Sequence, residues 1–475
     1  MKAADRLKLP PVPMPEQEPD ERIHNVREVP LGFTPAMAAQ EAERCLHCPD
    51  QPCVQGCPVG VQIPDFITAI QKGDFAGGIG IIKQTNLLPA VCGRVCPQEA
   101  QCQKACTVGK ALRDVGQAVQ IGQLERFLAD WEREHHAQVI PQIPPSTGKR
   151  IAVIGSGPAG LTVAGDLIKL GHAVTVFEAL HRPGGVLGYG IPEFRLPKDI
   201  VYTEVSYLTQ LGVDFQYNTV IGKSLTLDEV RRDYDAIFIG SGAGLPNFLG
   251  IPGENLLGVY SANEYLTRAN LMHAYDADSN TPILRRSTVA VLGGGNVAMD
   301  SARTALRLGA LKVMVLYRRS EEEMPARKEE YHHALQEGVE FHFLQNPTEI
   351  LGNSQGWVTG LTVQQMQLGE PDASGRRRPL PIPGQVSNVP ADLVIVAIGN
   401  APNPLIPAAL PGLEINKHGG IVANEETMET SIPGIFAGGD IVLGSATVIL
   451  AMGEGRKAAR AIHSWLMKTP GDAAP

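Results

Sequence analysis

The sequence predicts an α/β protein with a mainly helical region in front of it. A strand, a glycine-rich turn, a helix and a second strand follow one another at residues 150–178, and the pattern returns at 288–319. Apolar runs without polar alternation, such as 393–398, are typical of parallel strands buried on both faces. All eight cysteines, in contrast, lie between residues 45 and 106.

Composition limits the class of protein. With 475 residues, 43% of them hydrophobic and 19% charged, the chain can build two or three full cores. The net charge of -9 argues against a nucleic-acid surface. No stretch approaches the roughly 18 consecutive apolar residues of a membrane helix, and the N-terminus lacks the apolar core of a signal peptide. We therefore expect a cytoplasmic protein that binds neither membrane nor nucleic acid.

The N-terminal region, residues 1–145, holds every cysteine and ends in a proline-rich linker. In a reducing compartment, clustered cysteines indicate metal or redox chemistry rather than structural disulfides. Three interpretations stay open at this point: zinc held by four thiolates at each of two sites, iron–sulfur clusters, and dithiol exchange. Proline follows Cys57 and Cys96, as in the ligand runs of bacterial ferredoxins.

The first repeated unit matches the dinucleotide-binding fingerprint. Gly155 allows the tight turn, Gly157 lets the backbone approach a pyrophosphate, and Gly160 permits close packing of helix on strand. Pro158 and Ala159 open the helix whose free N–H groups face the phosphates. Glu178 ends the next strand about 20 residues on, where the fingerprint's carboxylate binds ribose hydroxyls.

The second unit has the same glycine-rich turn, but different residues follow its second strand. Its predicted binding residues are Gly293, Gly295, Asn296, Val297 and Ala298, with alanine in place of the third glycine. Arginines stand where an acid would favour an unphosphorylated ribose: Arg318, Arg319 and, further on, Arg327. Because arginine binds phosphate in forked geometry, this site should prefer NADP(H) over NAD(H).

These motifs and the run IFAGGD at 435–440 resemble the flavoprotein oxidoreductases with two dinucleotide domains. The resemblance implies FAD in the first unit and NADPH in a second unit inserted into it. It adds these residues to the FAD site: Gly185, Val220, Gly439, Asp440, Thr447 and Val448. No cysteine follows Cys106, which excludes a dithiol beside the flavin. Since zinc has no redox role and a flavoprotein of this kind needs an electron exit, two [4Fe-4S] clusters are the favoured interpretation.

A closer resemblance covers nearly the whole chain. The runs QTNLLPAVCGRVCPQEAQCQKAC, GGGNVAMD and AGGDIVLGSATVILAMGEGRKAA are similar to the small subunits of NADPH-dependent glutamate synthase. The cysteine region is also similar to the cluster domain of dihydropyrimidine dehydrogenase. The resemblance implies interleaved ligands: Cys45, Cys48, Cys53 and Cys106 for one cluster, and Cys57, Cys96 and Cys102 for the other. Cys92 matches a position that is not a ligand.

Glu125 is the expected eighth ligand, because the dehydrogenase has a glutamine there. The helical stripe of Ile121, Leu124, Leu128 and Trp131 places Glu125 at the edge of a buried face, where a carboxylate needs a cation or metal. The alternative is an exposed glutamate paired with a surface arginine.

The expected domains are a cluster domain at 1–145, an FAD domain at 146–285 and 395–475, and an NADPH domain at 286–394. The resemblance implies the NADPH-oxidising subunit of a glutamate synthase, with a large glutaminase and FMN subunit as partner. The alternative is the large subunit of a bifurcating NADH-dependent ferredoxin:NADP oxidoreductase, with a small flavin and iron–sulfur partner and possibly ferredoxin. A third hypothesis is a zinc-stabilised docking module fused to a simple NADPH–flavin reductase. The sequence contains no convincing acid–base catalytic residues.

Overall fold

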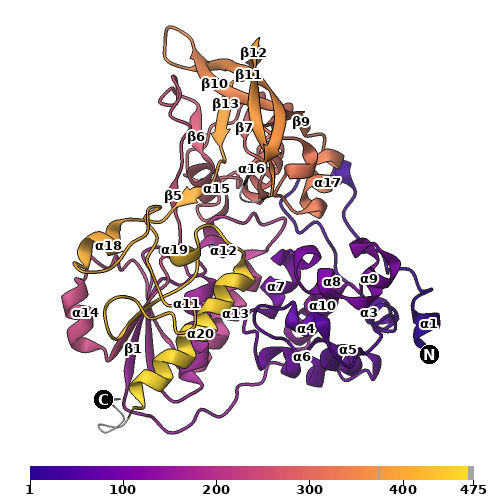
Figure 1. Ribbon diagram of the computed structural model, residues 1–475, viewed down its shortest axis with the longest axis vertical. Coiled ribbons are helices and arrows are strands. Elements are labelled where there is room, and N and C mark those ends of the chain that lie inside the picture. Colours follow the sequence, from indigo (N-terminus) through magenta and orange to yellow (C-terminus); the bar gives the residue numbers. More distant parts are fainter. Residues whose placement is uncertain (373–374, 469–475) are drawn as a thin grey trace.

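A computed structural model describes residues 1–372 and 375–468. Figure 1 shows the N-terminal helices beside the first nucleotide-binding unit, with the second unit above both in this view. Within the described residues, no helix is both long and apolar enough to cross a bilayer.

The N-terminal region is helical, as predicted. Proline occupies the first turn of several of its helices, where the missing N–H group costs no helical hydrogen bond. The helices are α1 (Ala3–Arg6), α2 (Pro19–Arg22), α3 (Pro35–Ala42), α4 (Pro52–Gln55), α5 (Ile63–Gln71), α6 (Phe75–Lys83), α7 (Pro89–Val95), α8 (Cys102–Ala105), α9 (Thr107–Leu112) and α10 (Ile121–Glu134).

The first unit is a five-stranded parallel sheet in the order β15-β4-β1-β2-β3. Its strands are β1 (Arg150–Ile154), β2 (Ala173–Phe177), β3 (Asp214–Gln216), β4 (Ala236–Ile239) and β15 (Ile435–Ala437). Its helices are α11 (Pro158–Ile168), α12 (Val186–Tyr189), α13 (Lys198–Gln210), α14 (Leu227–Asp233), α18 (Leu405–Ala409), α19 (Asp440–Leu443) and α20 (Val448–Leu466). Since β15 follows the whole second unit, the chain leaves this sheet and returns to it.

The second unit is also a five-stranded parallel sheet, in the order β6-β13-β7-β8-β9. Its strands are β6 (Val259–Ser261), β7 (Thr288–Leu292), β8 (Lys312–Tyr317), β9 (Glu340–Phe343) and β13 (Leu393–Val396), and its helices are α15 (Ala262–Asn270), α16 (Asn296–Arg307) and α17 (Lys328–Gln336). Because β6 precedes residue 286, we propose that this unit starts earlier than the sequence indicated. The short strands β5 (Leu245–Pro246) and β14 (Asn400–Ala401) pair where the chain enters and leaves it.

An antiparallel sheet extends the second unit. It consists of β10 (Gln345–Gly352), β11 (Val358–Pro371) and β12 (Arg377–Pro390), and it forms the top of Figure 1. Buried side chains of β10 and β11, among them Ile350, Leu361 and Val363, share a hydrophobic cluster with the second parallel sheet. The sheet therefore covers one face of that unit.

The cysteine region and the first unit share one hydrophobic core. It joins Phe66, Leu88 and Cys92 of the N-terminal helices to Leu161 of α11 and Met452 of α20. Figure 1 shows α20 running along the first unit on the side of these helices. The apolar contact holds the cysteines close to the first glycine turn.

Candidate functional site

A cavity of about 940 Å³ lies between the two nucleotide-binding units. This volume falls within the roughly 300–1,000 Å³ of small-molecule sites. The cavity brings together most of the predicted nucleotide-binding residues: Gly155, Gly157, Pro158, Ala159, Glu178, Gly185, Val220, Asn296, Val297, Gly439, Asp440, Thr447 and Val448. Its lining does not include the other predicted residues: Gly160, Gly293, Gly295, Ala298, Arg318, Arg319 and Arg327.

The first glycine turn is shaped as its sequence predicts. Gly155 has a φ of +100°, and a Cβ there would lie 2.5 Å from the carbonyl oxygen of Gly240. At Gly160 a Cβ would lie 2.0 Å from the carbonyl oxygen of Gly155, so only glycine lets α11 pack this closely on β1. At Gly157, in contrast, a Cβ would meet nothing within 4 Å. This open space at the start of α11 can receive a pyrophosphate.

The carboxylate of Glu178 is fixed beside this turn. It is buried, and its oxygens accept hydrogen bonds from the N–H groups of Ser156 at 3.0 Å and Leu180 at 2.8 Å. The Ser156 hydroxyl donates a further bond at 2.5 Å. The sequence analysis missed Ser156, although it lies inside the glycine motif. Glu178 is thereby held against the cavity, in position for ribose hydroxyls.

The C-terminal segment lines the same cavity beside the first turn. Gly439 has a φ of +80°, and its Cβ position lies 3.0 Å from the Cβ of Ala159. The Asp440 carboxylate accepts a hydrogen bond from the Ala446 N–H group at 3.1 Å, and burial raises its pKa to about 6. Thr447 caps α20 by accepting a bond from the Leu450 N–H group at 3.3 Å. The N-terminus of this long helix therefore also faces the cavity.

The second glycine turn repeats this geometry. Gly293 has a φ of +141°, and a Cβ there would lie 2.2 Å from the Ala397 carbonyl oxygen. At Gly295 a Cβ would meet nothing within 4 Å. Ala298 is fully buried in α16. Asn296 and Val297 line the large cavity, so the second turn faces the first unit.

The three predicted arginines lie in three different environments. Arg318 is exposed just after β8, and within residues 1–372 and 375–468 no carboxylate pairs with it. Arg319 is buried and paired with Asp372 at 2.7 Å, while its Nε donates to the Arg377 carbonyl at 2.8 Å. Arg327 is buried against the cysteine region, with Glu329 2.7 Å away. Of the three arginines, Arg318 is therefore the exposed one, whereas the guanidinium groups of Arg319 and Arg327 are buried and paired with carboxylates.

Four cysteines line a first cavity: Cys45, Cys48, Cys53 and Cys106. The rest of its lining has no charged side chain among the described residues. Burial, with neighbouring thiols, raises the pKa of Cys45 to about 11 and that of Cys53 to about 12. Thiolates at these positions need a bound cation, so the donor set fits a metal centre held by sulfur.

The other four cysteines, Cys57, Cys92, Cys96 and Cys102, line a second cavity together with Glu125. Glu125 is 8% exposed, and burial raises its pKa to about 8. No arginine or lysine pairs with it in the described part of the chain, which rules out the alternative of a surface ion pair. Its Oε1 accepts a hydrogen bond from the Asn86 side chain at 2.7 Å. A carboxylate buried among thiols fits a metal ligand.

Cys92 has a different environment from its neighbours. Its sulfur lies 3.6 Å from the Met452 sulfur and 3.7 Å from Oδ1 of Asn86. Asn86, which the sequence analysis did not single out, thus contacts both candidates for the eighth ligand. A side-chain hydrogen bond with Cys96, together with burial, raises the pKa of Cys92 well above the usual thiol value.

The second cysteine cavity adjoins the large cavity. Val95 and Pro97, on either side of Cys96, line the large cavity. The Gln101 side chain donates to the Thr447 hydroxyl at 3.4 Å. The second thiol set therefore lies beside the predicted flavin site. The first cavity shares Ile63 and Ile121 with the second cysteine cavity but no lining residue with the large cavity.

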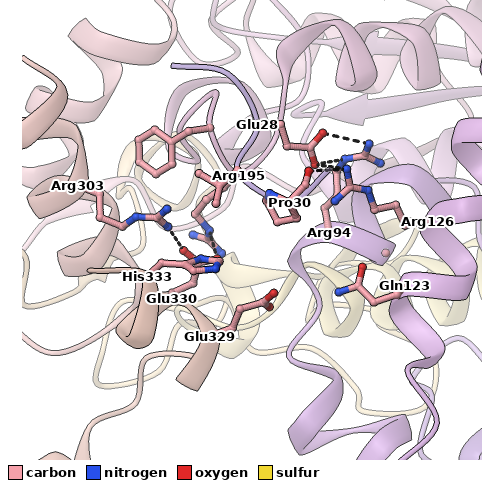
Figure 2. A pocket seen from close by; sticks show the side chains of 13 residues that line it. Glu28, Pro30, Arg94, Gln123, Arg126, Arg195, Arg303, Glu329, Glu330 and His333 are labelled. Atoms are coloured by element: carbon pink, nitrogen blue, oxygen red, sulfur yellow. Dashed lines mark hydrogen bonds and ion pairs between the residues drawn. The ribbon is translucent and has the colours of Figure 1, made fainter. Parts of the chain in front are cut away.

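A polar junction joins the cysteine region to the second unit. Figure 2 shows Arg94, Arg126 and Glu28 on one side of a small cavity and Arg195, Arg303 and Glu330 on the other. Arg94 pairs with Glu28 at 2.7 Å, and Arg195 pairs with Glu330 at 3.0 Å. Although burial opposes ionisation, Arg195 and Arg303 lower the pKa of Glu330 to about 2. Removing one partner of such a buried pair typically costs about 3–5 kcal/mol.

Two family profiles match the chain. Residues 22–137 match the family described as dihydropyrimidine dehydrogenase domain II, 4Fe-4S cluster, and residues 149–455 match pyridine nucleotide-disulphide oxidoreductase. FprA from Mycobacterium tuberculosis, solved in complex with NADPH, superposes with a TM-score of 0.57 at 22% identity, over 68% of this chain and 85% of FprA. This likeness concerns the fold.

Curated relatives are more similar in sequence. The glutamate synthase [NADPH] small chain of Escherichia coli is 40% identical over 92% of this chain and 93% of its own length. The NADP(+)-dependent formate dehydrogenase subunit beta of Moorella thermoacetica is 40% identical over 87% of this chain, which spans 60% of that subunit. The chain therefore belongs to the family of the glutamate synthase [NADPH] small chains, with a 4Fe-4S domain in front of a pyridine nucleotide-disulphide oxidoreductase domain.

Proposed function

We propose that this chain is the NADPH-oxidising, electron-transferring subunit of a glutamate synthase. The observation that carries the proposal is that the sites adjoin one another. The first glycine turn and the two residues after the second turn, Asn296 and Val297, line one large cavity, and the second cysteine cavity adjoins it. The similarity to the glutamate synthase small chain of E. coli over nearly the full length of both chains supports this assignment over the Moorella subunit.

Different residues would bind different parts of FAD and NADPH. Gly157 and the start of α11 would hold the FAD pyrophosphate, Glu178 its ribose, and the start of α20 its flavin side. Gly295 and Arg318 would hold NADPH. Bound flavin would supply the exchange between a two-electron hydride and single electrons, and bound clusters would supply one-electron carriers. The chain's own contribution is to orient these groups and to exclude water from the buried thiols.

Metal analysis tests the proposal. After anaerobic purification, we expect about eight irons per chain with matching acid-labile sulfide, as two four-iron clusters require. NADPH should bleach the flavin absorbance. Zinc without sulfide would contradict electron transfer and favour the docking-module hypothesis.

We also propose that Glu125, rather than Cys92, completes the second ligand set. Its burial, its raised pKa and its lack of a cationic partner support this. Glu125→Ala should lower the iron content toward about four per chain, whereas Cys92→Ser should keep about eight. The opposite pattern would assign the ligand to Cys92.

The partner decides the net reaction. We propose a large subunit that makes glutamate from glutamine and 2-oxoglutarate. Anaerobic purification from native cells should recover such a glutaminase-bearing chain, and NADPH oxidation by the complex should require both substrates. A small flavin and iron–sulfur partner with ferredoxin-coupled activity would instead assign the chain to a bifurcating transhydrogenase.

A further inference from the structure

Arg327, which the sequence predicted to contact a ribose phosphate, instead directs its guanidinium toward the cysteine region. It immediately precedes α17 as its N-cap residue, it is 7% exposed, and its guanidinium lies against the cysteine region. Its Nη1 donates to the Arg94 carbonyl at 3.1 Å, and its Nη2 donates to Oε1 of Gln98 at 3.3 Å. Arg94 lies between Cys92 and Cys96 in the sequence. The guanidinium therefore binds the end of α7, the segment that carries Cys92 and Cys96 of the second cysteine cavity.

The backbone of the same residue is attached to the second glycine turn. The Arg327 N–H group donates to Oδ1 of Asn296 at 2.9 Å. The preceding residue, Ala326, donates its N–H group to the Gly294 carbonyl at 3.1 Å. These two hydrogen bonds tie Arg327 to the second glycine turn.

Gln98 continues the connection to the cysteines. Its side-chain amide donates to the Cys92 carbonyl at 3.2 Å, and Gln98 itself lines the second cysteine cavity. A Cβ at Gly122 would lie 2.1 Å from this amide nitrogen. Gln98 is thus held tightly against α10, one turn before Glu125.

We propose that Arg327 and Gln98 are positioning residues that couple nucleotide binding at the second glycine turn to the reduction potential of the metal centre in the second cysteine cavity. The inference rests on the proposed function. Coupling between two sites is reciprocal, so the nucleotide affinity must then depend on the oxidation state of that centre. A purely structural contact would stabilise the junction without producing this dependence.

The test is a redox titration of the anaerobic holoprotein followed by electron paramagnetic resonance. It is done with and without saturating 2′-phospho-ADP-ribose, which carries the pyrophosphate and the 2′-phosphate of NADP but no nicotinamide. The signal of the second cavity is the one that Cys102→Ser removes. In the wild type we expect the midpoint potential to shift by at least the ~41 mV that corresponds to a fivefold difference in affinity, at 59 mV per tenfold.

Arg327→Met and Gln98→Met should abolish this shift while the analogue still binds. Arg22→Met is the matched control. Arg22 is also buried between the N-terminal region and α17 and pairs with Glu337 at 2.8 Å, but it bonds to neither the second glycine turn nor the segment of Cys92 and Cys96. It should keep the wild-type shift. Arg327→Lys retains the positive charge but loses the two-pronged guanidinium donor, so it should give a reduced shift. This variant replaces Arg327→Met in the test if the methionine variant loses iron.

Three outcomes would overturn the inference: no shift in the wild type, a full shift in both methionine variants, or loss of the shift in Arg22→Met as well. Iron content and bleaching of the flavin by NADPH are measured first on the wild type. Their failure would refute the proposed function, whereas their success without a shift would refute only the coupling.

Discussion

The two glycine turns differ in what an added side chain would meet. At the first position both turns have positive φ, and a Cβ would collide with a backbone carbonyl, at Gly155 as at Gly293. At the third position the first turn admits no Cβ, while the second holds the methyl group of Ala298. At the middle position, Gly157 and Gly295 both face open space. The comparison shows that the middle glycine leaves space for a ligand, whereas the outer positions are restricted by the packing of the chain itself.

The largest effect is expected from Gly157→Leu. The backbone at Gly157 has a φ of -70°, which a leucine can adopt, so the fold should tolerate the substitution. The side chain would fill the space reserved for the pyrophosphate, and FAD binding should be lost completely. Flavin absorbance after purification measures this, with far-ultraviolet circular dichroism as the folding control. Full flavin occupancy would refute the assignment of FAD to the first unit.

Gly295→Leu makes the same change in the second turn. FAD should remain bound, but NADPH should no longer bleach it, while dithionite still does. This variant and Gly157→Leu control for each other, because each should remove one nucleotide and spare the other. Loss of FAD from Gly295→Leu would show that the two turns do not act separately.

Arg318→Ala tests the residue that follows the second strand of the second unit, where the first unit has Glu178. A hydrogen bond to a charged group contributes about 1.5–3 kcal/mol, so the KM for NADPH should rise about tenfold or more. The KM for NADH should stay nearly constant, since NADH has no 2′-phosphate. Steady-state kinetics with both nucleotides measures the ratio. An equal loss for both would mean that Arg318 does not contact the phosphate.

Arg319→Met should have the smallest effect on nucleotide choice. Its guanidinium is already paired with Asp372, so the KM ratio should stay within about threefold of wild type. A lower melting temperature is expected instead, because the pair ties β8 to the hairpin of β11 and β12. A loss of NADPH preference as large as that of Arg318→Ala would restore the cluster of arginines that the sequence suggested.

Local patterns predicted much of this molecule. The glycine spacings and the acid at Glu178 follow from the chemistry of a turn and a helix start, and the structure places Gly155, Gly157 and Glu178 around one cavity. The division of the cysteines came from resemblance. Sequence order alone would have grouped Cys53 with Cys57, which line different cavities.

The contacts between distant segments could not be predicted in this way. Arg327 follows the arginine pair in sequence, but its surroundings come from a helix more than 200 residues earlier. The partner of Glu125, Asn86, lies 39 residues away. It belongs to the run QTNLLPAVC, but nothing in that run indicates which side chain Asn86 contacts. Buried polar pairs of this kind depend on how units pack, which local spacing does not encode.

The interleaving of the cysteines has a consequence for maturation of the protein. Cys106 completes the first thiol set, yet it follows every member of the second, and Cys57 of the second set follows directly on the first three. The cysteines of the first cavity enclose those of the second in the sequence, so folding of the segment from 45 to 106 around one cavity also brings the residues of the other together. Since metal binding to such sites is coupled to folding, loading one site organises the other. In the wild-type chain, which has all its ligands, the two centres should therefore be acquired in close succession during biogenesis.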